Sequence, residues 1–71
     1  MSAATITVTL NGEPRKVPAG LTLGTLLVHL QLRPELVAVE LNGDIVARDR
    51  FAACAVPPDA VLEIVHFVGG G

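Results

Sequence analysis

The stretch Thr5-Ile6-Thr7-Val8-Thr9-Leu10-Asn11-Gly12 decides how the fold begins. Apolar and threonine side chains alternate strictly up to Leu10, which is the pattern of a half-buried β-strand. Asn11-Gly12 then predicts a tight hairpin, because both residues tolerate positive φ angles. Residues 13–17 continue as a second, polar strand. Pro14 and Pro18 restrict that strand to an edge, since proline donates no hydrogen bond to a ladder.

The next segment has the pattern of one amphipathic helix. Thr22 is a suitable N-cap, and Pro34 prevents the helix from continuing past Arg33. The apolar stripe at helical spacing consists of Leu23, Leu26, Leu27 and Leu30. Gly24 interrupts good helix formers, so we expect another part of the chain to approach the helix closely there.

Three further strands follow from the same reasoning. Residues 37–41 predict a strand that buries Val37, Val39 and Leu41, and Asn42-Gly43 predicts a second tight turn into a short strand over 44–47. Residues 49–55 are expected to form one helical turn with Phe51 and Cys54 directed inward. Pro57-Pro58-Asp59 predicts a turn, and residues 61–67 predict the last strand. The element order is therefore ββαββ, a short turn and β, with one helix across a mixed sheet.

Size and composition exclude several classes of protein. Seventy-one residues make one domain, and 51% of them are hydrophobic, which argues against disorder. With a net charge of −2 and only five lysines and arginines, a nucleic-acid partner is not expected. No apolar run has the length of a membrane span, no signal peptide is recognisable, and the single cysteine forms no internal disulfide. These features predict a soluble, cytoplasmic protein without a membrane partner.

The last strand divides into two faces. Leu62 and Ile64 fall on the side expected to be buried, whereas Glu63 should lie in water. Val65 and Phe67 share the face of Glu63, so both are expected to be exposed. Two apolar side chains on one exposed face favour a partner-docking surface, and the alternatives are incidental exposure or burial under a neighbouring loop.

The chain ends in Val68-Gly69-Gly70-Gly71, a stretch that contributes little to a core. Glycines have no Cβ atom and can enter a channel too narrow for other residues, so residues 68–70 are expected to enter a partner's active site. The α-carboxylate of Gly71 is ionised at neutral pH and is a poor electrophile until it is activated. Joining it to AMP is the usual biological means, and a partner enzyme would supply ATP and Mg²⁺.

In this combination of features the chain resembles the ThiS family of ubiquitin-like sulfur carriers of thiamine (thiazole) biosynthesis. The resemblance is carried by the Asn11-Gly12 hairpin, by residues 37–48 and, most specifically, by residues 63–71. It departs at Pro57-Pro58-Asp59, where the family often has an Asp-Gly-Asp turn. The resemblance implies an α+β, ubiquitin-like β-grasp domain over residues 1–67 and a flexible C-terminal Gly-Gly tail over 68–71. It also implies that the first and last strands are adjacent and parallel at the centre of the sheet.

The resemblance further implies a function as a sulfur carrier. A ThiF-like (E1-like) adenylating enzyme would convert the carboxylate of Gly71 to an acyl adenylate. Sulfur from a cysteine desulfurase persulfide would then give a thiocarboxylate, and the thiazole synthase ThiG would take that sulfur into the thiazole ring. The chain would therefore be a protein co-substrate, not an enzyme, and would bind no cofactor of its own.

Other interpretations share parts of this pattern. A molybdopterin synthase small subunit has the same tail but usually a proline just before the glycines, where this chain has His66-Phe67-Val68. A ubiquitin-like protein modifier also requires adenylation, and a simple binding module could carry the glycines without chemistry. Catalysis by Cys54 is not expected, because His29 and His66 are far from it in sequence and no metal-ligand spacing is present. A small core residue is the simpler interpretation of Cys54, and a persulfide acceptor is the other.

Overall fold

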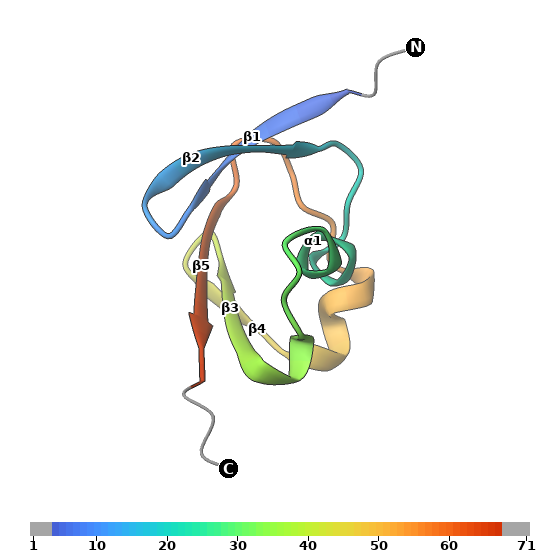
Figure 1. The fold of residues 1–71 in the computed structure, drawn as a ribbon, viewed down its shortest axis with the longest axis vertical. Helices are drawn as coiled ribbons and strands as arrows, with labels where there is room; N and C mark the ends of the chain where they lie inside the picture. The colour runs from blue at the N-terminus through green and yellow to red at the C-terminus, as the bar shows by residue number, and fades with distance from the viewer. Residues whose placement is uncertain (1–3, 68–71) are drawn as a thin grey trace.

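A computed structural model describes residues 4–67 of the chain. The sheet is formed by β1 (Thr5–Leu10), β2 (Glu13–Pro18), β3 (Val37–Leu41), β4 (Asp44–Val46) and β5 (Val61–His66). The helices are α1 (Leu23–His29) and two short 3-10 helices, η1 (Pro34–Leu36) and η2 (Arg48–Ala53). Figure 1 shows α1 on one side of the curved sheet, with β5 leading away to one end of the molecule.

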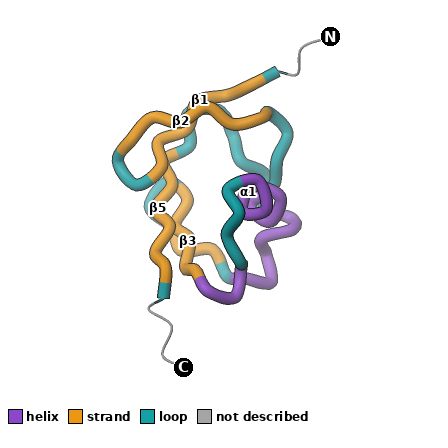
Figure 2. Tube along the Cα trace, viewed as in Figure 1, coloured by secondary structure: helices purple, strands orange, loops and turns teal. Residues whose placement is uncertain are grey.

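The last strand lies at the centre of the sheet. The strand order is β2-β1-β5-β3-β4, and β5 pairs in parallel with β1 and antiparallel with β3. The β1–β5 pairing covers only Thr9↔Val61 and Leu10↔Leu62, whereas the β3–β5 pairing covers five residue pairs. In Figure 2 the orange strands lie to one side of α1, and the 3-10 helices share the purple colour of α1. The strand order and pairing confirm the mixed sheet and the central, parallel placement of the first and last strands that the resemblance implied.

The helix begins where the sequence predicted. The Thr22 hydroxyl accepts a hydrogen bond from the Thr25 backbone N–H at 3.2 Å, and the Thr25 hydroxyl accepts one from the Thr22 N–H at 2.8 Å. This reciprocal capping box satisfies two amides that a helix otherwise leaves without partners. Because α1 has only two turns, most of its stability comes from burial of its apolar side.

One core fills the space between helix and sheet. Its buried apolar residues are Val8, Val17, Leu23, Leu26, Leu27, Val37, Val39, Phe51, Val56, Ala60, Leu62 and Ile64. The strand alternation therefore assigned the buried side correctly in β1, β3 and β5. Among the described residues, no buried side-chain nitrogen or oxygen lacks a hydrogen-bond partner.

Several boundaries and burial predictions differ from the structure. β4 ends at Val46 and β5 at His66, one residue earlier than predicted in each case. Leu41 is half-buried instead of buried, because it sits at the end of β3 next to the exposed turn. The helical turn expected over residues 49–55 is a 3-10 helix over Arg48–Ala53, and Cys54 beyond it is only half-buried. The pattern did not predict η1, which forms around Pro34 before β3 begins.

Gly24 lies where α1 approaches η2. A Cβ built on this glycine would lie 3.6 Å from the Ala52 Cα and 3.7 Å from the Phe51 carbonyl carbon. These are ordinary van der Waals distances. The expected close approach is therefore confirmed, but it leaves room for one methyl group.

Candidate functional site

The central feature of the candidate site is β5, which leads directly to the terminal glycines. Its inward residues Leu62 and Ile64 are 0% and 9% exposed, so the strand is fixed by the core. The hydrogen bonds of β5 alternate between its neighbours, as its pleat requires. β5 is therefore anchored on both edges along most of its length, and its last residues remain paired with β3.

Two asparagines from the two hairpin turns fasten the edges of β5. The Asn11 side chain accepts a hydrogen bond from the Ile64 N–H at 2.8 Å and donates one to the Ile64 carbonyl at 3.1 Å. The Asn42 side-chain oxygen accepts a hydrogen bond from the Val61 N–H at 2.8 Å, and the Asn42 backbone N–H donates to the Val61 carbonyl at 2.8 Å. The asparagine amide carries both a donor and an acceptor, so it replaces a backbone peptide where the neighbouring strand has ended.

Both asparagines adopt left-handed backbone conformations, with φ of 50° for Asn11 and 52° for Asn42. Asparagine tolerates this region better than most residues, which is why Asn-Gly favours tight hairpins. Each asparagine therefore makes the turn and also holds β5. The Asn-Gly pattern predicts the first role but not the second, because a turn signal is local and Asn11 bonds to a residue 53 positions away.

The predicted docking residues lie on the sheet face opposite α1, which we call the outer face. Val65 is 59% exposed and Phe67 is 50% exposed, as the strand pattern predicted. The Phe67 backbone N–H donates to the Leu36 carbonyl at 2.8 Å, which holds this residue to η1. The exposure of both side chains is confirmed, and their docking role stays a prediction.

Ile45 is a further exposed apolar residue of the outer face, and the strand pattern had not been used to predict it. It is 78% exposed, more than any other large apolar side chain in residues 4–67. Its cross-strand partner is Glu40, which is in turn paired with Glu63. The signal was present in the alternation of β4, because Val46 faces inward and its predecessor must therefore face outward.

The outer face also carries an unbalanced pair of acidic residues. Glu40 and Glu63 lie directly opposite each other on β3 and β5, and like charges in this position destabilise a sheet slightly. Within the described part of the chain the one ion pair is Arg33–Glu35 at 3.7 Å, away from these carboxylates. Over β3, β4 and β5 the outer face is therefore a mixture of apolar and acidic side chains.

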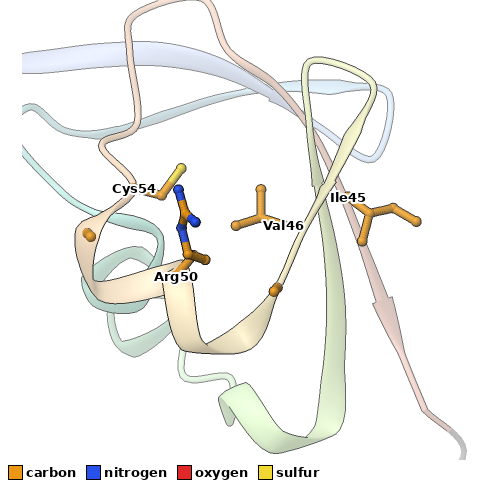
Figure 3. Close-up of a pocket in the computed structure, with 6 residues that line it drawn as sticks. Ile45, Val46, Arg50 and Cys54 are labelled. Atoms are coloured by element: carbon orange, nitrogen blue, oxygen red, sulfur yellow. The ribbon is translucent and has the colours of Figure 1, made fainter.

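Cys54 lies away from the outer face, at a pocket of about 520 Å³ between β4 and η2. Figure 3 shows the Arg50 side chain beside Cys54, with Val46 turned toward them and Ile45 turned away. The Cys54 thiol is half-buried and packs against the edge of the core. This position agrees with the simpler interpretation of Cys54 as a packing residue.

The remaining candidate groups do not form a site. His29 and His66 are both exposed, on α1 and at the end of β5 respectively. Residues 4–67 contain no group of three histidine, cysteine, aspartate or glutamate residues able to hold a metal ion. Over the same residues no helix is long and apolar enough to cross a membrane. The predicted tail residues Val68, Gly69, Gly70 and Gly71 lie outside the described residues.

Comparison with known proteins points in one direction. The ThiS family model matches residues 8–71. A protein named thiazole synthase from Magnetococcus marinus is 48% identical over 62 residues, and the sulfur carrier protein ThiS of Bacillus subtilis is 42% identical over 50 residues. These alignments cover 87% and 70% of this chain, and 19% and 76% of the respective relatives. The chain therefore corresponds to about a fifth of the longer relative.

The fold gives the same result. A crystal structure of the thiamine biosynthesis protein ThiS from Geobacter metallireducens superposes with a TM-score of 0.79 at 36% sequence identity. The superposition covers 93% of this chain and all of the Geobacter chain. The ubiquitin-like β-grasp architecture expected from the sequence is thereby confirmed.

Proposed function

The chain belongs to the ThiS family, and on that basis we propose that it is a sulfur carrier of thiamine biosynthesis whose reactive group is the carboxylate of Gly71. In this role the folded domain is recognised by partner enzymes, and the terminal glycines deliver the carboxylate to their active sites. The domain itself supplies a substrate group and no catalytic residue.

One structural observation supports this proposal above the others. β5 is held at the centre of the sheet by two strands and two asparagine side chains, and the tail sequence follows it directly. A carrier needs a rigid body and a reactive end joined without a long linker, because a flexible linker longer than the distance to be spanned lowers the effective concentration of that end at an active site. Only Phe67 separates β5 from Val68.

The proposed chemistry has three steps. A ThiF-like adenylating enzyme uses ATP and Mg²⁺ to join the Gly71 carboxylate to AMP, releasing pyrophosphate. The terminal sulfur of a persulfide, supplied by a cysteine desulfurase, attacks the acyl carbon and displaces AMP, and a thiol then cleaves the sulfur–sulfur bond and is oxidised to a disulfide. The resulting thiocarboxylate is a soft nucleophile that passes its sulfur to thiazole synthase.

The outer face is the proposed recognition surface for these enzymes. Val65 and Phe67 lie beside the start of the tail, and Ile45 extends the apolar surface across β4. Burying such side chains contributes about 25 cal/mol per Å² of apolar area. An enzyme that covers this face would hold the domain with the tail directed into its active site.

The test uses the full chain with its cognate adenylating enzyme, ATP and Mg²⁺. Pyrophosphate release should require Gly70 and Gly71, so a chain that ends at Gly69 should be inactive. The matched control is Lys16→Arg, which removes the one lysine of the chain and should react normally. Adenylation of the truncated chain would refute the proposal. Intact-mass analysis separates a carrier, which gains sulfur in place of oxygen, from a protein modifier, which forms covalent adducts.

A further inference from the structure

The edge of β5 that faces β1 is only partly covered. The β1 side is reached by backbone groups of Ala60 and Leu62, which accept hydrogen bonds from Thr9 and Asn11 at 2.8 Å. β1 then ends at the turn, and the Asn11 side chain takes over for Ile64. Alternate residues of a strand direct their backbone groups to the same edge, so the next residue after Ile64 to face this edge is His66.

The backbone groups of His66 point toward this uncovered edge. The opposite edge of β5 faces β3, and there Val61 and Phe67 bond to residues that flank β3. The odd-numbered residues of β5 therefore direct their backbone groups toward β3. His66↔Val37 is therefore a pair without backbone hydrogen bonds between its members. The register leaves the His66 backbone out of the β3 ladder, and none of the turn, loop or cap hydrogen bonds within residues 4–67 involves it, so its N–H and its carbonyl are both directed at the uncovered edge.

The two outermost strands of the sheet are protected in ways that this edge is not. β2 carries Pro14 and Pro18, and β4 is only three residues long. Prolines and short strands are the usual means by which proteins prevent another chain from pairing with a sheet. The free edge at the end of β5 carries no proline, and it borders the residues that lead to Gly71.

We propose that thiazole synthase pairs an extended segment of its own chain with this edge, so that its backbone bonds to the N–H and the carbonyl of His66. The proposal rests on the proposed function, because it concerns the partner that receives the tail. An extended backbone fits the edge because its carbonyl can accept from the His66 N–H while its N–H donates to the His66 carbonyl, as between neighbouring strands of a sheet. Thiazole synthase is the occupant because relatives of that name contain a segment similar to this chain within a longer polypeptide.

The added strand would also orient the tail. Residues 68–71 begin two positions after His66 in the sequence. A partner segment fixed beside His66 therefore lies next to the start of the tail, while the exposed Val65 and Phe67 remain available for side-chain contacts on the outer face. Backbone pairing would set the direction of the tail, and the apolar contacts would add affinity.

His66→Pro removes the N–H that the added strand would need. The substitution leaves the β3 ladder intact, because the His66 backbone makes no bond to β3. Proline also requires an extended conformation of the preceding residue, and Val65 already has it as part of β5. His66→Ala is the matched control, because it removes the imidazole and keeps the N–H. We expect the proline variant to bind thiazole synthase roughly 5- to 10-fold more weakly, the effect of one hydrogen bond, and the alanine variant to bind within about 2-fold of the unsubstituted chain. Equal affinities of the two variants would overturn the proposal.

Amide hydrogen exchange provides a measurement that needs no substitution. The His66 amide of the unmodified chain should become protected when thiazole synthase is added. An unprotected His66 amide in a complex that forms would overturn the proposal, and protection by the adenylating enzyme alone would overturn the assignment of the occupant. Neither measurement requires adenylation or sulfur transfer, so failure of the proposed function is detected separately, by the absence of sulfur at Gly71.

Discussion

Replacing Asn11 with glycine should destabilise the domain although the residue is exposed and lies in a turn. The substitution keeps the left-handed backbone, which glycine adopts without strain, but removes both side-chain bonds to Ile64. A hydrogen bond contributes about 1 kcal/mol net, so we expect the free energy of unfolding to fall by about 2 kcal/mol. The added flexibility of glycine in the unfolded chain and the relief of backbone strain in the folded chain are small and oppose each other.

Two further variants separate the causes. Asn11→Ala loses the same bonds and also places a β-carbon at φ 50°, so its loss should be larger by about 1 kcal/mol. Asn42→Gly removes a single side-chain bond, to the Val61 N–H, and should lose only about 1 kcal/mol. The predicted order of stability is therefore Asn42→Gly above Asn11→Gly above Asn11→Ala.

Urea unfolding followed by far-ultraviolet circular dichroism is the appropriate assay, since the chain has no tryptophan or tyrosine to report fluorescence. At roughly 4–8 °C per kcal/mol for a domain of this size, Asn11→Gly should also lower the Tm by about 8–16 °C. If Asn11→Gly unfolds within about 0.5 kcal/mol of the unsubstituted protein, or no more easily than Asn42→Gly, the asparagine side chain does not hold β5 as described.

Three other substitutions test the packing and the outer face. Gly24→Ala should stabilise the domain by roughly 0.5–1 kcal/mol in the same urea assay, because alanine favours the helix and its methyl group meets η2 at van der Waals distance; a clear loss of stability would contradict that geometry. Leu27→Ala should cost about 3 kcal/mol, because the side chain is fully buried, and a loss under about 1 kcal/mol would place the core elsewhere. Val65→Asp should weaken binding to the adenylating enzyme or to thiazole synthase at least about 5-fold, with little change in Tm. The control Val28→Asp, on the exposed side of α1, should leave binding unchanged. Equal effects of the two substitutions on binding would exclude the outer face as the docking surface.

Local patterns predicted most of the fold. The alternation in residues 5–10 and 37–41, the Thr22 cap and the two Asn-Gly turns each depend on interactions between near neighbours, so the sequence alone specifies them. The same alternation placed Val65 and Phe67 on the exposed face.

Features that depend on strand order could not be predicted in this way. The Asn11 bonds to Ile64 and the uncovered edge at His66 exist only because β1 ends opposite Leu62, before β5 ends. No pattern within either strand encodes that offset. The 3-10 helix η1 also depends on context, since three residues around a proline give no periodic signal. The predicted tail, residues 68–71, lies outside the residues that the structure describes and stays a prediction from sequence and family.

The central claim is that sulfur is carried on Gly71, and it is tested most directly by intact-mass analysis of the chain purified from cells that are making thiazole, with peptide mapping of the terminal fragment. The account predicts a fraction of molecules that end at Gly71 and carry one sulfur in place of one oxygen on that residue. Molecules that end at Gly71 and show no such exchange while the cells make thiazole, or a sulfur located on Cys54 instead, would contradict it.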